Sequence, residues 1–90
     1  MKRIECVVTG RVQMVMFRDF TKRNARKLKL AGIVENKVDG SVYVVAEGHE
    51  EALEKLISLL YRGPILAHVD HVDCTWGEAT GDYKEFNIKY

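Results

Sequence analysis

The stretch that decides the fold is Gly32–Gly48, GIVENKVDGSVYVVAEG. Two apolar runs, 33–38 and 41–47, flank the dipeptide Asp39-Gly40. Asp-Gly between such runs is a strong signal for a β-hairpin, because both residues tolerate a positive φ. Side chains alternate between the faces of a strand, so one face of the second strand carries Val42, Val44 and Ala46. The sequence therefore predicts two adjacent antiparallel strands at the centre of the chain.

Amphipathic helices are predicted on both sides of this hairpin. The first begins near Phe17 and ends at Gly32, since glycine favours helix C-termini. Its inner side is expected to carry Phe17, Phe20, Asn24 and Leu28, with Thr21 and Ala25 beside them. The second helix covers about 50–61 and stops at Gly63-Pro64. Its apolar residues follow the i, i+3, i+4, i+7 spacing of a buried helix face: Leu53, Leu56, Ile57 and Leu60.

Alternating apolar and polar residues predict further strands at 3–9, about 68–76 and 84–90. The resulting order is β-α-β-β-α-β followed by one terminal strand, which is the split βαβ arrangement. The sequence therefore predicts an α+β fold. We expect a ferredoxin-like βαββαβ sandwich, in which two helices cover one face of an antiparallel sheet and a short extra C-terminal strand is added.

Length and charge narrow the function classes. Ninety residues predict a single domain over 1–90. A formal net charge of +1 gives no global attraction to nucleic acid or to anionic membranes. No apolar run approaches the roughly 20 residues of a membrane helix, and the N-terminus lacks the apolar stretch of a secretory signal. We therefore expect a cytoplasmic protein without a membrane partner.

The metal-binding and redox residues are few. Cys6 and Cys74 lie in strand-like patterns, and we expect reduced core cysteines, with a bridge between adjacent strands as the alternative. His49, His68 and His71 form no metal-ligand motif. The basic residues of the first helix predict a solvated face. An RNA-binding surface is disfavoured, because Tyr43 alone is a poor stacking platform.

The loop before the first helix is a candidate anion site. Backbone N–H groups at a helix N-terminus have no internal partners, and the helix dipole favours negative charge there. Arg18 lies in the first turn and can add a charged fork to a phosphate. On these residues alone, a solvated Arg18 is an equally good interpretation. Asn36 is similarly ambiguous, since a strand asparagine can make a merely local hydrogen bond.

Two motifs together resolve this ambiguity. Gly10-Arg11-Val12-Gln13, Val15 and Phe17-Arg18 resemble the acylphosphatase signature Gly-x-Val-Gln-Gly-Val-x-Phe-Arg. The segment 32–42 resembles the family's Gly-Trp-Val-x-Asn-x-x-Asp-Gly-x-Val. Weaker similarity continues through later residues to the C-terminal strand: Gly63-Pro64, Ala67, Val69, Val72, Phe86, Ile88 and Tyr90.

The resemblance implies hydrolysis of small acyl phosphates to a carboxylate and inorganic phosphate. It implies that Arg18 binds the phosphoryl oxygens and that Asn36 positions a water for in-line attack. It also implies a monomer that needs no metal and no cofactor. The loop that would cradle the phosphate comprises Gln13, Met14, Val15, Met16, Phe17 and Arg18.

The sequence departs from the family pattern at two positions. Ile33 replaces a tryptophan, which we interpret as a change in packing. Met14 replaces a glycine, and a positive φ there would cost a methionine on the order of 1–2 kcal/mol. The alternative functions are therefore a catalytically weakened phosphate-binding module and, less favoured, an RNA-binding domain of the same fold. Met14, Val15 and Met16 could also form an apolar lip, or simply pack within the loop.

Overall fold

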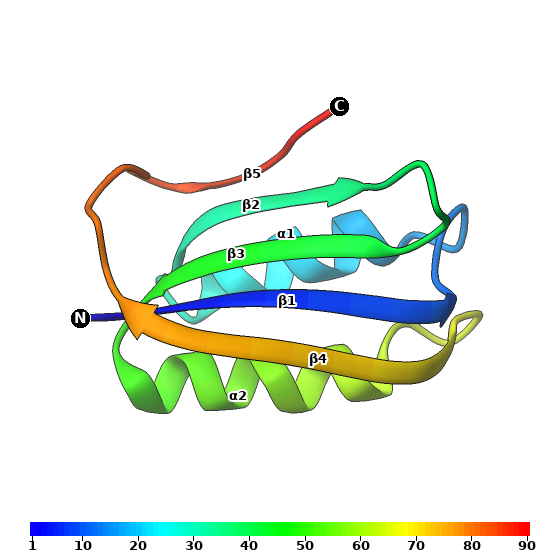
Figure 1. Ribbon diagram of the computed structural model, residues 1–90, viewed down its shortest axis with the longest axis horizontal. Coiled ribbons are helices and arrows are strands. Elements are labelled where there is room, and N and C mark those ends of the chain that lie inside the picture. The colour runs from blue at the N-terminus through cyan, green and yellow to red at the C-terminus, as the bar shows by residue number, and fades with distance from the viewer.

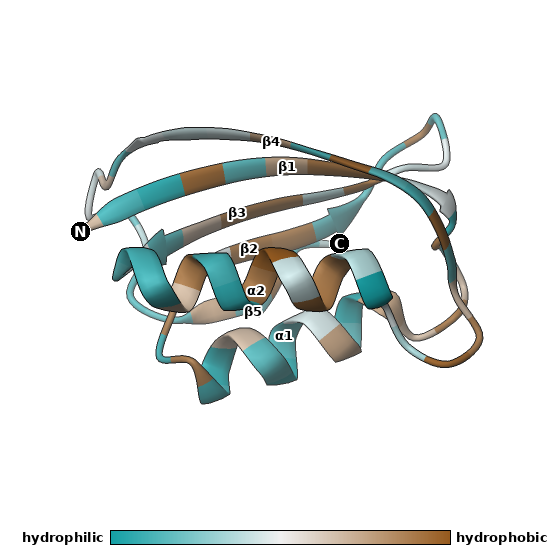
Figure 2. Ribbon diagram, turned by 90° about the horizontal axis from the view of Figure 1, so that it is seen from below, coloured by the Kyte–Doolittle hydropathy of each residue, from teal (hydrophilic) through white to brown (hydrophobic).

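The computed structural model describes residues 1–90 as five strands and two helices (Figure 1). The sheet order is β4-β1-β3-β2-β5. Figure 2 shows both helices on the same side of the sheet. The predicted ferredoxin-like α+β sandwich is confirmed. Neither helix is long and apolar enough to cross a membrane. The elements are β1 Lys2–Arg11, α1 Phe17–Lys27, β2 Ala31–Asn36, β3 Val42–Gly48, α2 Glu50–Arg62, β4 His68–Glu78 and β5 Phe86–Ile88.

The extra C-terminal strand gives the sheet a mixed character. The first four strands pair antiparallel, as predicted. β5 instead pairs parallel with β2, matching Gly32 with Phe86 and Val34 with Ile88. It forms three residues of strand rather than the seven expected at 84–90. Its parallel course brings the C-terminus back toward the end of the sheet where β2 ends (Figure 1).

The core lies between the helices and one face of the sheet. The predicted inner face of β3 is buried, as are Leu53, Leu56 and Leu60 of α2. In α1 the buried stripe is Phe17, Thr21 and Ala25. Phe20, Asn24 and Leu28 are only half-buried. The residues that face the core are therefore four positions apart and form a narrower stripe than predicted. Further buried side chains come from β1: Ile4, Cys6 and Val8.

The β2–β3 hairpin is confirmed, but its connection is longer than Asp39-Gly40 alone. Five residues, 37–41, separate the two strands. The Asp39 carboxylate accepts hydrogen bonds from the backbone N–H of Ser41 at 2.9 Å and its hydroxyl at 2.6 Å. The hydrogen bonds from the Asp39 side chain form a turn that competes with strand pairing. This explains why β2 ends at Asn36 and β3 begins only at Val42. Val38, the last residue of the predicted run 33–38, therefore lies in the turn and is fully exposed.

β1 continues through Gly10, where the sequence predicted its end. Its pairing register with β4 shifts between Thr9 and Gly10, and Gly10 has a φ of 124°. A Cβ at this position would collide with the backbone carbonyl of His68. The glycine thus permits a β-bulge, which bends the strand and re-aims the loop that follows it.

The predicted end of α1 at Gly32 is wrong. The helix ends at Lys27, and Lys29 adopts a left-handed conformation with a φ of 59°. The N–H of Leu30 donates to the carbonyl of Ala25 at 2.9 Å, and that of Lys29 donates to Arg26 at 3.0 Å. This pair of bonds is a Schellman motif, which usually has glycine at the left-handed position. Gly32 lies in β2, where a Cβ would collide with the carbonyl of Val45.

Replacing Lys29 with glycine is expected to raise the free energy of unfolding by about 1 kcal/mol, because glycine adopts the left-handed conformation without steric conflict. For a chain of this size the melting temperature should rise by roughly 4–8 °C. Lys55→Gly, in the interior of α2, should lower stability by about 1 kcal/mol. Thermal unfolding followed by circular dichroism measures both. An unchanged or lowered melting temperature for Lys29→Gly would contradict this account of the helix end.

Cys6 and Cys74 form a disulfide, so the expectation of two reduced cysteines is wrong. They are direct partners in the antiparallel register of β1 and β4, and their Cα atoms are 4.1 Å apart. The prediction of reduced cysteines rested on their small number and on the expected cytoplasmic location. The register of β1 and β4 instead places the two cysteines opposite each other. The bond ties β4, an edge strand, to β1 near the centre of the sheet.

Reduction of this disulfide is expected to lower the free energy of unfolding by about 2–4 kcal/mol, because the bond closes a long loop in the unfolded chain. The cysteines are separated by 68 positions. Urea denaturation with and without reductant measures the difference. A double variant, Cys6→Ala with Cys74→Ala, serves as the control that reductant should not affect. Two titratable thiols in the unreduced, denatured protein would show that the bond is absent.

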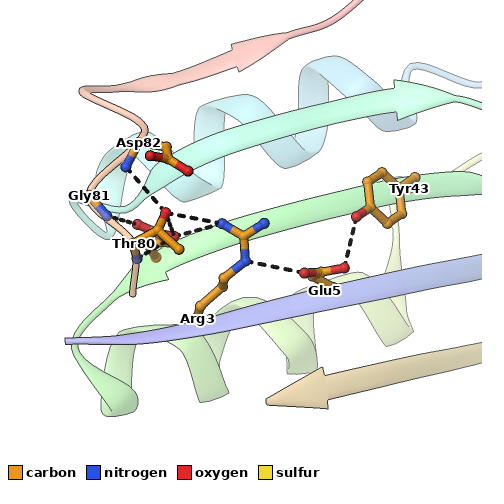
Figure 3. Close-up of polar contacts among 7 residues, drawn as sticks. Arg3, Glu5, Tyr43, Thr80, Gly81 and Asp82 are labelled. Atoms are coloured by element: carbon orange, nitrogen blue, oxygen red, sulfur yellow. Dashed lines mark hydrogen bonds and ion pairs between the residues drawn. The ribbon is translucent and has the colours of Figure 1, made fainter. Parts of the chain in front are cut away.

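A buried carboxylate secures the segment between β4 and β5 (Figure 3). Glu47, only 6% exposed, lies 2.7 Å from the Arg3 guanidinium. It also accepts hydrogen bonds from the backbone N–H groups of Thr80 and Gly81, both at 3.0 Å. Burial alone would raise the pKa of Glu47, but these donors outweigh it and lower the pKa to about 2. The start of the segment leading to β5 is thereby fixed to β3.

This network predicts acid sensitivity. Because the fold favours the Glu47 carboxylate, its stabilisation is fully present above the ordinary pKa of 4.5 and is lost as the pH falls through about 2. The lost free energy of unfolding is at most about 3 kcal/mol.

Glu47→Gln should therefore be less stable than the wild type at pH 7, and the gap should narrow toward pH 2. Glu78→Gln is the matched control, since Glu78 is 78% exposed and pairs only with Lys2. It should change stability by less than about 1 kcal/mol. Urea denaturation across pH measures both variants. A gap that stays constant with pH would contradict the role of the Glu47 carboxylate.

Candidate active site

A cavity of about 510 Å³ lies beside the loop between β1 and α1. It brings together Arg18 and Asn36, as the sequence predicted, and includes Met14, Met16 and Phe17 of the expected loop. Gln13 and Val15 do not line it. The full lining comprises Val12, Met14, Met16, Phe17, Arg18, Asp19, Lys22, Asn36, Ile88 and Tyr90.

The loop presents unpaired backbone donors. None of the N–H groups of residues 13–16 donates a hydrogen bond within the protein, and the first N–H groups of α1 have no intrahelical partner. Met14 and Met16 have positive φ values of 61° and 65°, with Val15 between them outside this region. Such alternation turns successive N–H groups toward one concave side, which binds anions. No side chain caps the helix, so these donors remain free.

The positive φ of Met14 decides a question that the sequence left open. Met14 adopts a left-handed conformation with a φ of 61°, which glycine would adopt more easily. This conformation carries a local cost of about 1–2 kcal/mol for a methionine.

Gln13 connects the loop to the β2–β3 hairpin. Its side-chain amide donates to the backbone carbonyl of Lys37 at 2.7 Å and to that of Ser41 at 2.9 Å. Figure 1 shows the two loops at the same end of the sheet. Because Asn36 immediately precedes Lys37, the Gln13 amide fixes the loop relative to Asn36.

The side chains of the loop divide between packing and exposure. Val15 is partly buried against the core. Met14 and Met16 are 99% and 66% exposed, so loop packing does not account for them. Of the two alternatives for these three residues, packing applies to Val15, and the two methionines are the exposed apolar side chains beside the cavity.

Arg18 is available to an anion. No carboxylate lies within ion-pair distance of it, whereas the neighbouring Asp19 pairs with Arg23 at 2.9 Å. The Arg18 guanidinium carbon lies 5.1 Å from the centre of the Tyr90 ring, which is a cation–π distance. This contact leaves the charge of the guanidinium unneutralised.

Five lining residues were not predicted as site residues: Val12, Asp19, Lys22, Ile88 and Tyr90. Ile88 and Tyr90 belong to the alternation of the C-terminal segment, but only the parallel pairing of β5 with β2 places them here. Lys22 lies one turn after Arg18 and was interpreted as part of a solvated face. The i, i+4 spacing from Arg18 was the available signal for it.

Asn36 is the last residue of β2. Its side-chain oxygen Oδ1 is buried and has no hydrogen-bond partner in the protein. An unpaired buried acceptor costs about 1–3 kcal/mol, and such groups are rare enough to require an explanation. Asn36 therefore brings an unused hydrogen-bond acceptor to the wall of the cavity.

Known proteins are similar to this chain in sequence and in architecture. The family model for acylphosphatase matches residues 4–88. An acylphosphatase from Thermus thermophilus is 48% identical, covering 98% of this chain and 99% of its own. One from Salinibacter ruber is 46% identical, covering 98% and 93%. The crystal structure of acylphosphatase from Bacillus subtilis superposes with a TM-score of 0.97 at 37% identity, covering 100% of both chains. The chain therefore belongs to the acylphosphatase family of enzymes.

Proposed function

We propose that this protein hydrolyses the carboxyl–phosphate anhydride of small acyl phosphates by in-line attack of a water that Asn36 orients. One observation carries the proposal. A single cavity beside the loop of free backbone N–H groups is lined by Arg18, which no carboxylate neutralises, and by Asn36, whose Oδ1 has no partner in the protein. The first two suit a phosphoryl group, and the third suits a water.

The phosphoryl group binds to the loop from Gln13 to Arg18. The N–H groups of the loop and of the first turn of α1 donate to its non-bridging oxygens, and the helix dipole adds to the attraction. Arg18 donates two parallel hydrogen bonds, a geometry that its guanidinium fork permits. These donors stabilise the charge on the equatorial oxygens, which is the main task in phosphoryl transfer.

Asn36 acts on the nucleophile. Its Oδ1 accepts a hydrogen bond from the water, which directs an oxygen lone pair of the water at phosphorus. A new P–O bond forms as the P–O bond to the acyl oxygen breaks, and the electron pair leaves with the carboxylate. The released proton is carried by the phosphate product. Because a carboxylate is a stable leaving group, no general acid is needed, and the scheme uses neither a metal ion nor a cofactor. We propose that the enzyme works as a cytoplasmic monomer.

Hydrolysis of benzoyl phosphate in the presence of a chelator tests this scheme. Asn36→Ala should lower kcat on the order of 10²–10³-fold with a small change in KM, because it removes positioning of the water. Arg18→Ala should also raise KM and weaken inhibition by inorganic phosphate, since it removes a charged contact to the phosphoryl group. Ser58→Ala is the control, because this exposed polar residue of α2 makes no contact with the site and lies outside the cavity. Its rate should stay within about twofold.

Two other results would redirect the assignment. A wild-type rate retained by Asn36→Ala would rule out its role in orienting water. Phosphate binding without hydrolysis would instead support the weakened binding module, and Met14→Gly would then be the variant expected to restore turnover.

A further inference from the structure

We propose that Met14 and Met16, with Tyr90 opposite, form an acyl-binding surface that favours substrates with large apolar acyl groups. This inference rests on the proposed hydrolysis of acyl phosphates and names the substrate class within it. It assigns a role to the side chains of Met14 and Met16, which the binding of the phosphoryl group by the loop N–H groups does not use.

The polar groups of the cavity are committed to the phosphoryl end. Arg18, Asn36 and the loop N–H groups serve the phosphate and the water. Val12 and Phe17 are each only 1% exposed and belong to the core. Apart from Asp19 and Lys22, the lining surface left for the rest of a substrate is apolar, and it comes from Met14, Met16, Ile88 and Tyr90.

In-line geometry places the acyl group on this surface. The nucleophile and the leaving group lie on opposite sides of phosphorus. The atom that positions the nucleophile, Oδ1 of Asn36, is buried, so the leaving acyl oxygen points away from it, toward the open side of the cavity. The two methionines and Tyr90 are exposed on the lining of that cavity.

The two methionines have no role in the fold that would explain them. Both occupy left-handed backbone conformations that glycine adopts more easily, yet both side chains extend into solvent. Backbone strain that persists without a packing benefit points to function. Methionine is flexible and polarizable, and so it suits apolar groups of varied shape.

Charge at the rim does not favour a second anionic group. Asp19 and Lys22 both line the cavity and carry opposite charges, and Asp19 also pairs with Arg23. An acyl group bearing a carboxylate or a phosphate would meet attraction and repulsion together. Apolar contact with the acyl group is therefore the main feature by which the site would distinguish one acyl phosphate from another.

The test compares kcat/KM for acetyl, butyryl and hexanoyl phosphate, whose carboxylates have nearly the same basicity. Full burial of a methylene contributes about fourfold, and on an open surface we expect about twofold. The four additional methylenes of the hexanoyl group should therefore favour hexanoyl over acetyl phosphate by about sixteenfold in the wild type. Met14→Asn retains a residue tolerant of positive φ but removes the apolar contact. It should lower the hexanoyl-to-acetyl ratio at least threefold, and Met16→Asn in addition should lower it further.

The readout is the ratio within each variant, because substitution in the loop can change the absolute rate. Ile65→Asn is the matched control, since Ile65 is 98% exposed and lies outside the cavity, and its ratio should equal that of the wild type. A wild-type enzyme that hydrolyses all three substrates equally, or a ratio that Met14→Asn leaves unchanged, would overturn the acyl surface while the proposed function stands. Failure to hydrolyse any of the three would overturn both.

Discussion

The site depends on one constraint: residues 13–16 must leave their backbone N–H groups without partners inside the protein. Unpaired amides are tolerated only where water or a ligand can reach them, so this run has to stay at the surface while its ends are held firmly. Positive φ at Met14 and Met16 turns the donors to one side. The uncapped start of α1 extends the same row of donors. An anion is the natural partner for such an array.

The fold holds both ends of this loop. At one end the bulge at Gly10 bends β1 just before the loop begins. At the other end Phe17 is buried in the core at the first turn of α1. Between them the Gln13 amide bonds to the two carbonyls that flank the hairpin turn. The site is thus assembled by hydrogen bonding between two loops that the hydrophobic core alone would leave free to move relative to each other.

Much of the fold and of the site could be predicted from local sequence patterns. The features that were not predicted depend on contacts between residues far apart in the chain or on unusual backbone conformations. Alternation and helical spacing located all seven elements, and the motifs around Arg18 and Asn36 identified two residues that share a cavity. Lys29 was missed because glycine is the usual signal for a left-handed helix end, and here lysine adopts it. The disulfide was only the alternative prediction, because strand register, which fixes which cysteines meet, could not be derived from the sequence pattern. Tyr90 was missed because parallel pairing of β5 cannot be inferred from its short pattern.

The far end of the sheet contributes to the site through β5. Glu47 fixes the start of the segment that follows β4, and Arg26 of α1 donates to the carbonyl of Phe86 at 2.8 Å and to the side chain of Asn87 at 2.9 Å. Arg26 was expected to be solvated, yet it ties α1 to β5. These contacts determine where the chain runs as it approaches Tyr90, which stacks on Arg18. The ion pair of Arg3 with the buried Glu47 and the hydrogen bonds of Arg26 fix the segment before Tyr90 at two points, so the cation–π contact at Arg18 depends on the path of the C-terminal segment as well as on α1.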